Sequence, residues 1–184
     1  MYDVRTIDNF LPKKQLKELT DVMMGPEFPW FYTTGITHPW ESEENKELNC
    51  YKFAHVFYCE YNATSPFFPL LMPIIEKLDT FAIIHIRAFM LTYTGKEPYM
   101  GPMHFDVGSA NSSKDNLVSI KGSMTSIFYL NTNNGYTLFD DGRKCNSVAN
   151  RLITFPGNIY HASVGANDVK SRVIINFNYY KSNS

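Results

Sequence analysis

The chain has 184 residues, enough for one domain with a sizeable core. Its 17 basic and 18 acidic residues give a formal net charge of −1, which excludes a broad basic surface, so we expect no nucleic-acid partner. We expect neither a signal peptide nor a membrane anchor, since no apolar run reaches the required length. Cys50, Cys59 and Cys145 form no CxxC pair, which favours ordinary thiols in a reducing cytoplasm over disulfides or a zinc site.

The first 80 residues are predicted to be a helical support region. Pro12 precedes the segment 13–24, whose apolar side chains recur at helical spacing. A second helix is expected over 65–78, although Pro69 and Pro73 complicate its first turns because proline lacks the N–H that a helix needs. These two helices are expected to pack against whatever the rest of the chain forms.

From residue 81 the pattern changes to that of short strands. The segment 82–93 is rich in isoleucine and aromatic residues, and turn signals such as Asn134-Gly135 and Pro156-Gly157 separate the later runs. Many short strands behind two helices predict a mainly β (α+β) chain, a single domain over 1–184 with a small barrel or jelly roll over 81–184. The later strands are expected at 123–131, 136–139, 150–155, 159–164 and 172–180.

His104 and Asp106 are candidate metal ligands, because residues two apart leave a strand on the same face and can reach one ion. His161, at a strand that follows the Pro156-Gly157 turn, is the third candidate. Two imidazoles and one carboxylate make up the facial triad of non-haem Fe(II) oxygenases, which leaves coordination positions open. An HxD tripeptide alone is a weak signal, and hydrogen-bonded structural histidines are the alternative.

Arg172 lies eleven residues after His161, beyond the turn 165–168. We expect an antiparallel hairpin that returns Arg172 to about the height of His161, a separation that suits a short dicarboxylate held between a metal ion and a guanidinium. Alternation along this strand predicts an apolar face that packs and a polar face that lines a cavity. The apolar face holds Val173, Ile175, Phe177 and Tyr179, and the cavity face holds Arg172, Ile174, Asn176 and Asn178.

The order of these motifs resembles that of the Fe(II)- and 2-oxoglutarate-dependent oxygenases, specifically the prolyl-4-hydroxylase-like branch. The resemblance runs from about Leu91 to Tyr180, half of the chain. Two departures are Asn134, which replaces the first of two usual glycines, and a spacing from His161 to Arg172 that is longer than in some relatives. The similar segments are 91–99 before the HxD motif, the core strand 126–131, the Gly-Gly-x-Thr-x-Phe-like segment 134–139, and the run 155–161 into the distal histidine.

This resemblance implies a double-stranded β-helix, with iron at its open end held by His104, Asp106 and His161. It implies that 2-oxoglutarate chelates the iron while its C5 carboxylate pairs with Arg172. The implied cofactors are Fe(II), 2-oxoglutarate as cosubstrate, dioxygen and ascorbate. The implied reaction couples oxidative decarboxylation to succinate with hydroxylation of a C–H bond, since Asp106 occupies the position that halogenating relatives leave for chloride.

Two tyrosines match family positions in the cosubstrate pocket. Tyr129 corresponds to a residue that shares the C5 carboxylate, and Tyr93 to one that lines the pocket; for each, an amphipathic core residue is the alternative. His85 and Arg87 share a strand face with Tyr93. For these two we expect an internal hydrogen bond, with the rim of the pocket as the alternative position.

The resemblance implies a prolyl residue in a protein or peptide as the substrate, with free amino acids or other small molecules next. Two other classes of function stay open. One is a cupin-like hydrolase or lyase that uses the same metal ligands without 2-oxoglutarate, and the other is a non-catalytic jelly-roll binding module. The sequence does not determine the oligomeric state.

Overall fold

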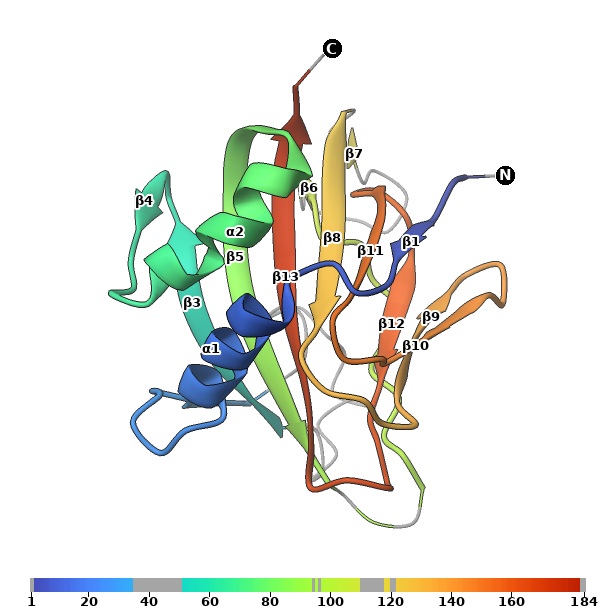
Figure 1. The fold of residues 1–184 in the computed structure, drawn as a ribbon. Helices are drawn as coiled ribbons and strands as arrows, with labels where there is room; N and C mark the ends of the chain where they lie inside the picture. Colours follow the sequence, from blue (N-terminus) through green and yellow to red (C-terminus); the bar gives the residue numbers. More distant parts are fainter. Residues whose placement is uncertain are drawn as a thin grey trace.

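The computed structural model describes residues 2–34, 51–93, 95, 97–109, 118–119 and 122–182. Within these residues the chain is mainly β, with helices near its start (Figure 1). The elements in order are β1 (Arg5–Ile7), α1 (Lys13–Met23), β2 (Phe31–Thr34), β3 (Tyr51–Cys59), β4 (Asn62–Ala63), the 3-10 turn η2 (Phe68–Leu71), α2 (Met72–Ile75), η3 (Glu76–Leu78), β5 (Thr80–Thr92), β6 (Gly108–Ser109), β7 (Val118–Ser119), β8 (Ser123–Tyr129), β9 (Tyr136–Phe139), β10 (Lys144–Asn146), β11 (Arg151–Pro156), β12 (His161–Val164) and β13 (Ser171–Lys181).

Two antiparallel sheets form a jelly roll. The main sheet has the order β1-β11-β8-β13-β5-β3-β2, with β4 paired to β3, and the small sheet has the order β10-β9-β12. Isolated bridges join Met100 to Val164 and His104 to His161, so the segment leading into the HxD motif runs along the free side of β12. The predicted double-stranded β-helix is confirmed.

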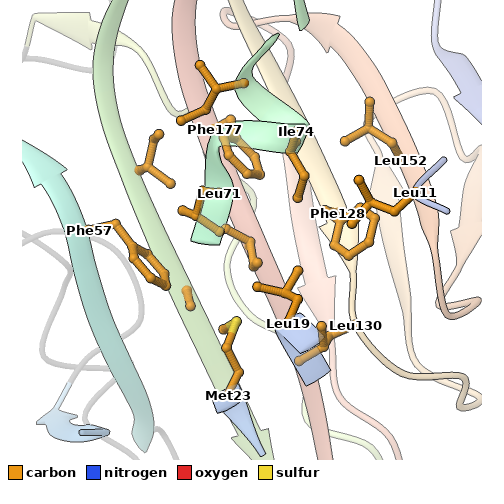
Figure 2. Packing of buried hydrophobic residues seen from close by; sticks show 14 of the residues in the cluster. Leu11, Leu19, Met23, Phe57, Leu71, Ile74, Phe128, Leu130, Leu152 and Phe177 are labelled. Carbon is orange, nitrogen blue, oxygen red and sulfur yellow. The ribbon is translucent and has the colours of Figure 1, made fainter. Parts of the chain in front are cut away.

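The main hydrophobic core lies between the helices and the outer face of the main sheet. Figure 2 shows Ile74 of α2 beside Phe128 and Phe177 of the sheet, with Leu19 and Met23 of α1 in the same cluster further along it. Burial of each such side chain stabilises the fold by about 1.5–3 kcal/mol. A second apolar cluster lies between the two sheets and supports the site from behind; it contains Ile127, Tyr129, Phe139, Cys145, Ile153, Phe155 and Ile174.

The alternation predicted along the last strand is correct. Val173, Ile175, Phe177 and Tyr179 of β13 belong to the core under the helices. The opposite face turns toward the interior of the jelly roll, where Arg172 is fully buried. The main sheet therefore packs helices on one side and presents polar groups on the other.

The first 80 residues are more than a helical support region, which corrects the sequence prediction. Strand β3 pairs with β5, and β1 pairs with β11, so both extend the main sheet. The segment 51–59 has the aromatic-rich composition that is typical of a strand, which the sequence prediction overlooked. In the structure His55 and Phe57 are buried at alternate positions of this strand. The segment 35–50 lies outside the described residues.

The second predicted helix is interrupted. Its residues form η2, α2 and η3 in succession, each with three or four residues. Pro69 lies within η2 and Pro73 within α2, and a proline cannot donate the backbone hydrogen bond that a continuous helix needs. The apolar residues Leu71, Ile74 and Leu78 are buried nonetheless.

Strands β12 and β13 do not form the predicted hairpin. β12 pairs with β9 in the small sheet, whereas β13 lies between β5 and β8 in the main sheet. β5 and β8 pair with the two edges of β13, so β12 cannot pair with it. The segment 165–170 therefore connects the small sheet to the main sheet. Since the two sheets face each other, Arg172 still approaches β12, and its Nη1 donates to Ser163 Oγ at 2.6 Å.

In the part of the chain that the structure describes, no helix has the length and apolar character that crossing a membrane requires. Cys59 and Cys145 are free thiols, and Cys50 lies outside the described residues. The cytoplasmic location expected from the cysteines stays a prediction.

Candidate metal centre

The two candidate histidines lie directly opposite each other. His104 N donates to His161 O at 2.9 Å, and His161 N donates to His104 O at 2.8 Å. Side chains of such an antiparallel pair leave on the same side of the sheet. The two imidazole rings accordingly lie with their centroids 4.7 Å apart. Backbone pairing between two segments far apart in the sequence thus brings these ligands together.

Asp106 completes the group from the same face, two residues after His104. One carboxylate oxygen lies 3.6 Å from His104 Nε2, and the other lies 3.6 Å from His161 Nε2. The ligand atoms of all three residues lie within 4.8 Å of one another. Ligands at about 2.0–2.2 Å from an ion fit such a spacing after small side-chain adjustments.

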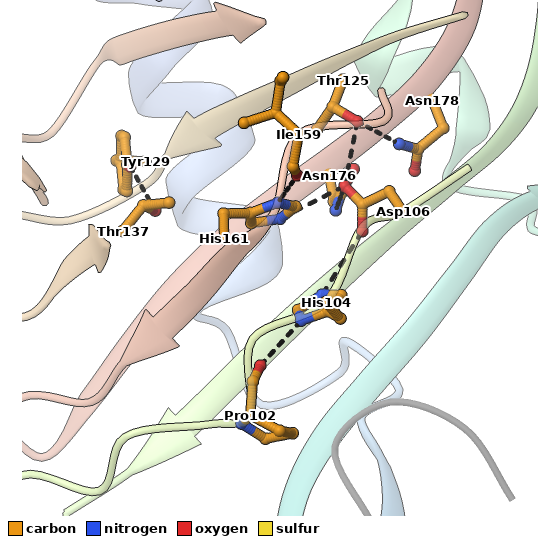
Figure 3. A network of polar contacts seen from close by, with 10 residues as sticks. All are labelled: Pro102, His104, Asp106, Thr125, Tyr129, Thr137, Ile159, His161, Asn176 and Asn178. Carbon is orange, nitrogen blue, oxygen red and sulfur yellow. Dashed lines mark hydrogen bonds and ion pairs between the residues drawn. The ribbon is translucent and has the colours of Figure 1, made fainter. Parts of the chain in front are cut away.

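Both histidines are oriented by backbone carbonyls. Nδ1 of His104 is 3.1 Å from Pro102 O, and Nδ1 of His161 is 3.0 Å from Ile159 O. Because a carbonyl can only accept, Nδ1 is the donor in each contact, and in the neutral imidazole Nε2 is then the nitrogen without a proton, on the side that faces Asp106 (Figure 3). Second hydrogen bonds of this kind fix the tautomer of metal-binding histidines.

Asp106 is held by a polar network from the main sheet. Its Oδ2 accepts from Asn176 Nδ2 at 2.9 Å and from Thr125 Oγ1 at 3.1 Å. Thr125 in turn accepts from Asn178 Nδ2 at 2.8 Å, so its hydroxyl proton is directed to the carboxylate (Figure 3). Asn176 and Asn178 lie on the predicted polar face of β13. The role of Thr125 was not foreseen, because its position on β8 gives no spacing signal relative to the HxD motif.

The charges of the three ligands are coupled. Burial would raise the pKa of Asp106, but the two imidazoles and the Asn176 amide hold that pKa well below its usual value. Burial lowers the pKa of His161. For His104 burial also acts to lower the pKa, but attraction to Asp106 prevails and raises it. Asp106 is thus an anionic ligand, and because imidazole binds a metal in its neutral form, a cation competes with protons here.

Arg172 lies fully buried behind this cavity. Its Nε donates to Ser147 Oγ at 2.7 Å and its Nη1 to Ser163 Oγ at 2.6 Å. Its Nη2 is buried and has no hydrogen-bond partner among the residues that the structure describes. Burial lowers the pKa of this guanidinium, yet an arginine keeps its charge. An unpaired buried donor on a permanent cation is costly, and a carboxylate would satisfy it. Neither Ser147 nor Ser163 was predicted.

Gly135 gives the Arg172 side chain its space. A Cβ at this position would lie 2.6 Å from Arg172 Cδ and 2.8 Å from Val164 O. Any larger residue would therefore displace the guanidinium or the backbone of β12. The glycine in the segment 134–139, noted from the sequence as part of a motif, thus has a steric reason.

The two tyrosines are placed differently. Tyr129 is fully buried in the second core cluster, with its hydroxyl 2.7 Å from Thr137 Oγ1 and its ring 5.5 Å from Arg172 Cζ. Thr137 itself lines the cavity. Tyr93 follows the end of β5, is 51% exposed, and is absent from the residues that line the cavity. The alternation of β5 does not extend past Thr92, and Tyr93 contacts the 167–170 segment instead.

The cavity beside the triad opens between the sheets. It is lined by the three candidate ligands and by side chains of β3, β5, β8, β9, β12 and β13. His85 and Arg87, for which an internal hydrogen bond was expected, both line it, as does Lys52, which sequence reasoning did not single out. The cavity residues are Lys52, His85, Arg87, Phe89, Leu91, His104, Phe105, Asp106, Ile127, Thr137, His161, Ser163, Ile174 and Asn176.

No family model matches the sequence, and no curated protein matches it. Solved structures do match its fold. A 2OG-Fe(II) oxygenase family oxidoreductase from Burkholderia pseudomallei superimposes with a TM-score of 0.66 at 11% identity, over 98% of this chain and 86% of that one. A prolyl hydroxylase from Trichoplax adhaerens, in complex with a hypoxia inducible factor peptide, gives 0.60 at 14% identity, over 97% and 83%.

HygX from Streptomyces hygroscopicus, with nickel, 2-oxoglutarate and hygromycin B bound, gives a TM-score of 0.61 at 9% identity, over 99% of this chain and 84% of that one. The chain therefore has the fold of the prolyl-4-hydroxylases and other 2-oxoglutarate–Fe(II) oxygenases. This confirms the fold that the sequence resemblance implied. At these identities, function has to be argued from the site itself.

Proposed function

We propose that the protein is an Fe(II)- and 2-oxoglutarate-dependent dioxygenase that hydroxylates a C–H bond of its substrate. The observation that carries the proposal is a buried guanidinium near a His–Asp–His cluster, with one nitrogen, Nη2, that has no partner among the described residues. The cluster alone is compatible with several metal enzymes. The buried Nη2 of Arg172 favours a bound anion, and a site that binds only a metal ion would not need such a group.

The donor set fits Fe(II). His104 and His161 present Nε2 and Asp106 presents carboxylate oxygens, so two nitrogens and one oxygen bind from one side of an ion. This set leaves the remaining coordination positions open, as in non-haem Fe(II) oxygenases. Mn²⁺, Co²⁺ and Ni²⁺ fit the same donors, since selection among these metals depends on availability as well as affinity.

The surroundings of Arg172 fit the far carboxylate of 2-oxoglutarate. Ser147 and Ser163 hold two of the guanidinium nitrogens, which leaves Nη2 pre-positioned as a donor. Thr137, at the cavity wall, is hydrogen-bonded to the Tyr129 hydroxyl, so this pair of hydroxyls forms a polar part of the wall that the carboxylate can approach. We assign Tyr129 to this end of the pocket and assign no cosubstrate contact to Tyr93.

Iron, when bound, would activate dioxygen as the oxidant for C–H hydroxylation; 2-oxoglutarate would supply two of the four electrons as it is decarboxylated to succinate, and ascorbate would be the reductant that maintains Fe(II). The protein's own contribution is positional. Backbone carbonyls orient the imidazoles, Thr125 and Asn176 orient the carboxylate, and the apolar cluster behind the site excludes water. A fixed carboxylate at Asp106 keeps a halide out of that position, which favours hydroxylation.

The substrate we propose first is a prolyl residue in a peptide or protein, with a small molecule as the second candidate. The structural likeness to a peptide-bound prolyl hydroxylase supports the first, and the likeness to an oxygenase with hygromycin B bound supports the second. Both of these neighbours share the fold, so the fold alone does not decide between the two kinds of substrate.

Binding measurements test the class before any substrate is known. Anaerobic protein should bind one Fe(II) or Mn²⁺, and only the metal-loaded protein should then bind 2-oxoglutarate at the strength expected for chelation. Metal binding without 2-oxoglutarate binding would identify a cupin-like enzyme instead. Absence of stoichiometric metal binding would identify a non-catalytic module. A mass search for a gain of one oxygen atom in peptide and metabolite pools then identifies the substrate.

A further inference from the structure

One wall of the cavity carries positive charge that the proposed cosubstrate does not use. Arg87 on β5 and Lys52 on β3 both line the cavity. Arg87 is paired in register with Asn176 of β13, and residues directly opposite in an antiparallel ladder project on the same face. Since Asn176 reaches Asp106 with its amide, Arg87 projects into the same interior, next to the candidate metal centre.

Arg87 has no hydrogen bond or ion pair with any residue that the structure describes. It is partly buried, and burial lowers the pKa of its guanidinium while the charge of Asp106 acts in the opposite direction. Asp106 attracts it without forming an ion pair with it, since this carboxylate is held by Thr125 and Asn176 and faces both imidazoles. A half-buried guanidinium in this state offers a fork suited to a carboxylate.

The charges of the residues that line the cavity also favour binding of an anion. Among the described residues that line it, Asp106 is the one carboxylate, whereas Lys52 and Arg87 are basic. The Lys52 ammonium lies 4.3 Å from the centre of the Phe89 ring, which places it over a β5 side chain on the cavity wall. The charges of divalent iron and dianionic 2-oxoglutarate cancel each other, so binding them does not neutralise the Arg87 guanidinium.

Arg87 and Arg172 lie at different positions along the main sheet. In the register of β5 and β13, Arg172 lies opposite Leu91, and Arg87 lies four residues further along β5. Four residues of a strand span about 13 Å at roughly 3.3 Å per residue. Because Ser147 and Ser163 hold the Arg172 guanidinium at its own end, the two arginines offer two candidate anion positions, one behind the triad at Arg172 and one beside it at Arg87.

We propose that the substrate of this enzyme carries a carboxylate, and that Arg87 binds it with Lys52 adding attraction from the neighbouring strand. This inference rests on the proposed function in taking the cavity as the place where substrate binds. It narrows the substrate to an acid: a molecule with a free carboxylate, or a peptide with an acidic side chain next to the residue that is hydroxylated.

Matched pairs of probes that differ by one charge test this directly. The protein is loaded with Zn²⁺ and 2-oxoglutarate so that no turnover occurs, and binding is followed by ligand-observed NMR. N-acetylproline against N-acetylprolinamide tests a free carboxylate. Acetyl-Pro-Glu-amide against acetyl-Pro-Gln-amide tests an acidic side chain. We expect the acidic member of at least one pair to bind roughly 10-fold or more tightly than its neutral partner, as charged hydrogen bonds require.

Variants then test whether Arg87 and Lys52 cause the preference for the acidic probe over its neutral partner. Arg87→Gln should abolish the discrimination between acid and amide, Arg87→Lys should restore part of it, and Lys52→Gln should reduce it by about threefold, as loss of a more distant charge predicts. Arg5→Gln, which removes an exposed charge on β1, should leave it unchanged. Thermal unfolding of each variant shows that the fold is retained.

The outcomes separate this inference from the proposed function. If wild-type protein binds metal and 2-oxoglutarate but shows no preference for acids, whether it binds both members of each pair or neither, the acid-binding position is refuted and the oxygenase proposal stands. If Arg87→Gln loses 2-oxoglutarate affinity as strongly as Arg172→Ala, Arg87 belongs to the cosubstrate pocket and the inference is wrong. If wild-type protein binds no 2-oxoglutarate, the proposed function itself fails.

Discussion

Removal of the Arg172 guanidinium tests the cosubstrate pocket. Two of its nitrogens are fixed by Ser147 and Ser163, and Nη2 is buried and unpaired. A carboxylate that takes Nη2 forms a charge-assisted hydrogen bond to a donor that is already positioned, and such bonds contribute about 1.5–3 kcal/mol. Arg172→Ala should therefore weaken 2-oxoglutarate binding by roughly 10- to 100-fold, while metal affinity changes little.

Two further substitutions grade the effect. Arg172→Lys should recover part of the affinity, because an ammonium keeps the charge but cannot make two parallel hydrogen bonds. Ser147→Ala removes a neutral hydrogen-bond partner and leaves the guanidinium in place. The free energy of 2-oxoglutarate binding should therefore weaken by about 1 kcal/mol or less. Arg5→Ala controls for the loss of a remote positive charge.

The assay is anaerobic titration calorimetry of 2-oxoglutarate into protein loaded with Mn²⁺, with metal stoichiometry and thermal unfolding measured on each variant. Unchanged 2-oxoglutarate affinity in a folded, metal-loaded Arg172→Ala protein would show that the cosubstrate pocket is misplaced. A loss of metal binding together with 2-oxoglutarate binding would show that Arg172 supports the whole site rather than one carboxylate.

Three other substitutions address the metal and the space around it. The double variant His104→Ala/His161→Ala should lose stoichiometric metal binding, and full occupancy in equilibrium dialysis would refute the triad. Asn176→Ala removes the amide that orients the Asp106 carboxylate, a candidate metal ligand, and should weaken metal binding by roughly 10- to 100-fold; an unchanged metal dissociation constant would contradict this role. Gly135→Ala should cost about 1–3 kcal/mol of folding free energy in chemical denaturation, and weaken 2-oxoglutarate binding, because its Cβ meets the guanidinium stem at 2.6 Å. Gly165→Ala, whose nearest contact is an ordinary 3.4 Å, is the matched control and should show neither effect.

The sequence predicted those parts of the site that depend on local periodicity. The i and i+2 spacing of His104 and Asp106 gave their common face, and alternation along β13 gave both its apolar and its polar side. Helix α1 was predicted to within one residue, since helical spacing and the preceding proline act over a short range.

What the sequence did not predict depends on contacts between distant segments. β12 pairs with β9 rather than with β13, and no local sequence signal specifies which two strands pair. Thr125, Ser147 and Ser163 act by hydrogen bonds to residues far along the chain, so their roles become visible after the sheets are assembled. Lys52 was missed because β3 was taken as part of a helical region.

The central claim is that metal, 2-oxoglutarate and dioxygen act together at this site. Isotopically labelled dioxygen, supplied to iron-loaded protein with 2-oxoglutarate and a pool of peptides and acids, tests it most directly. We predict one labelled oxygen atom in succinate and one in the hydroxylated product, with slow succinate formation when the substrate is absent and no hydroxylation by Asp106→Ala. Absence of oxygen uptake that depends on 2-oxoglutarate, or unlabelled succinate, would contradict the account.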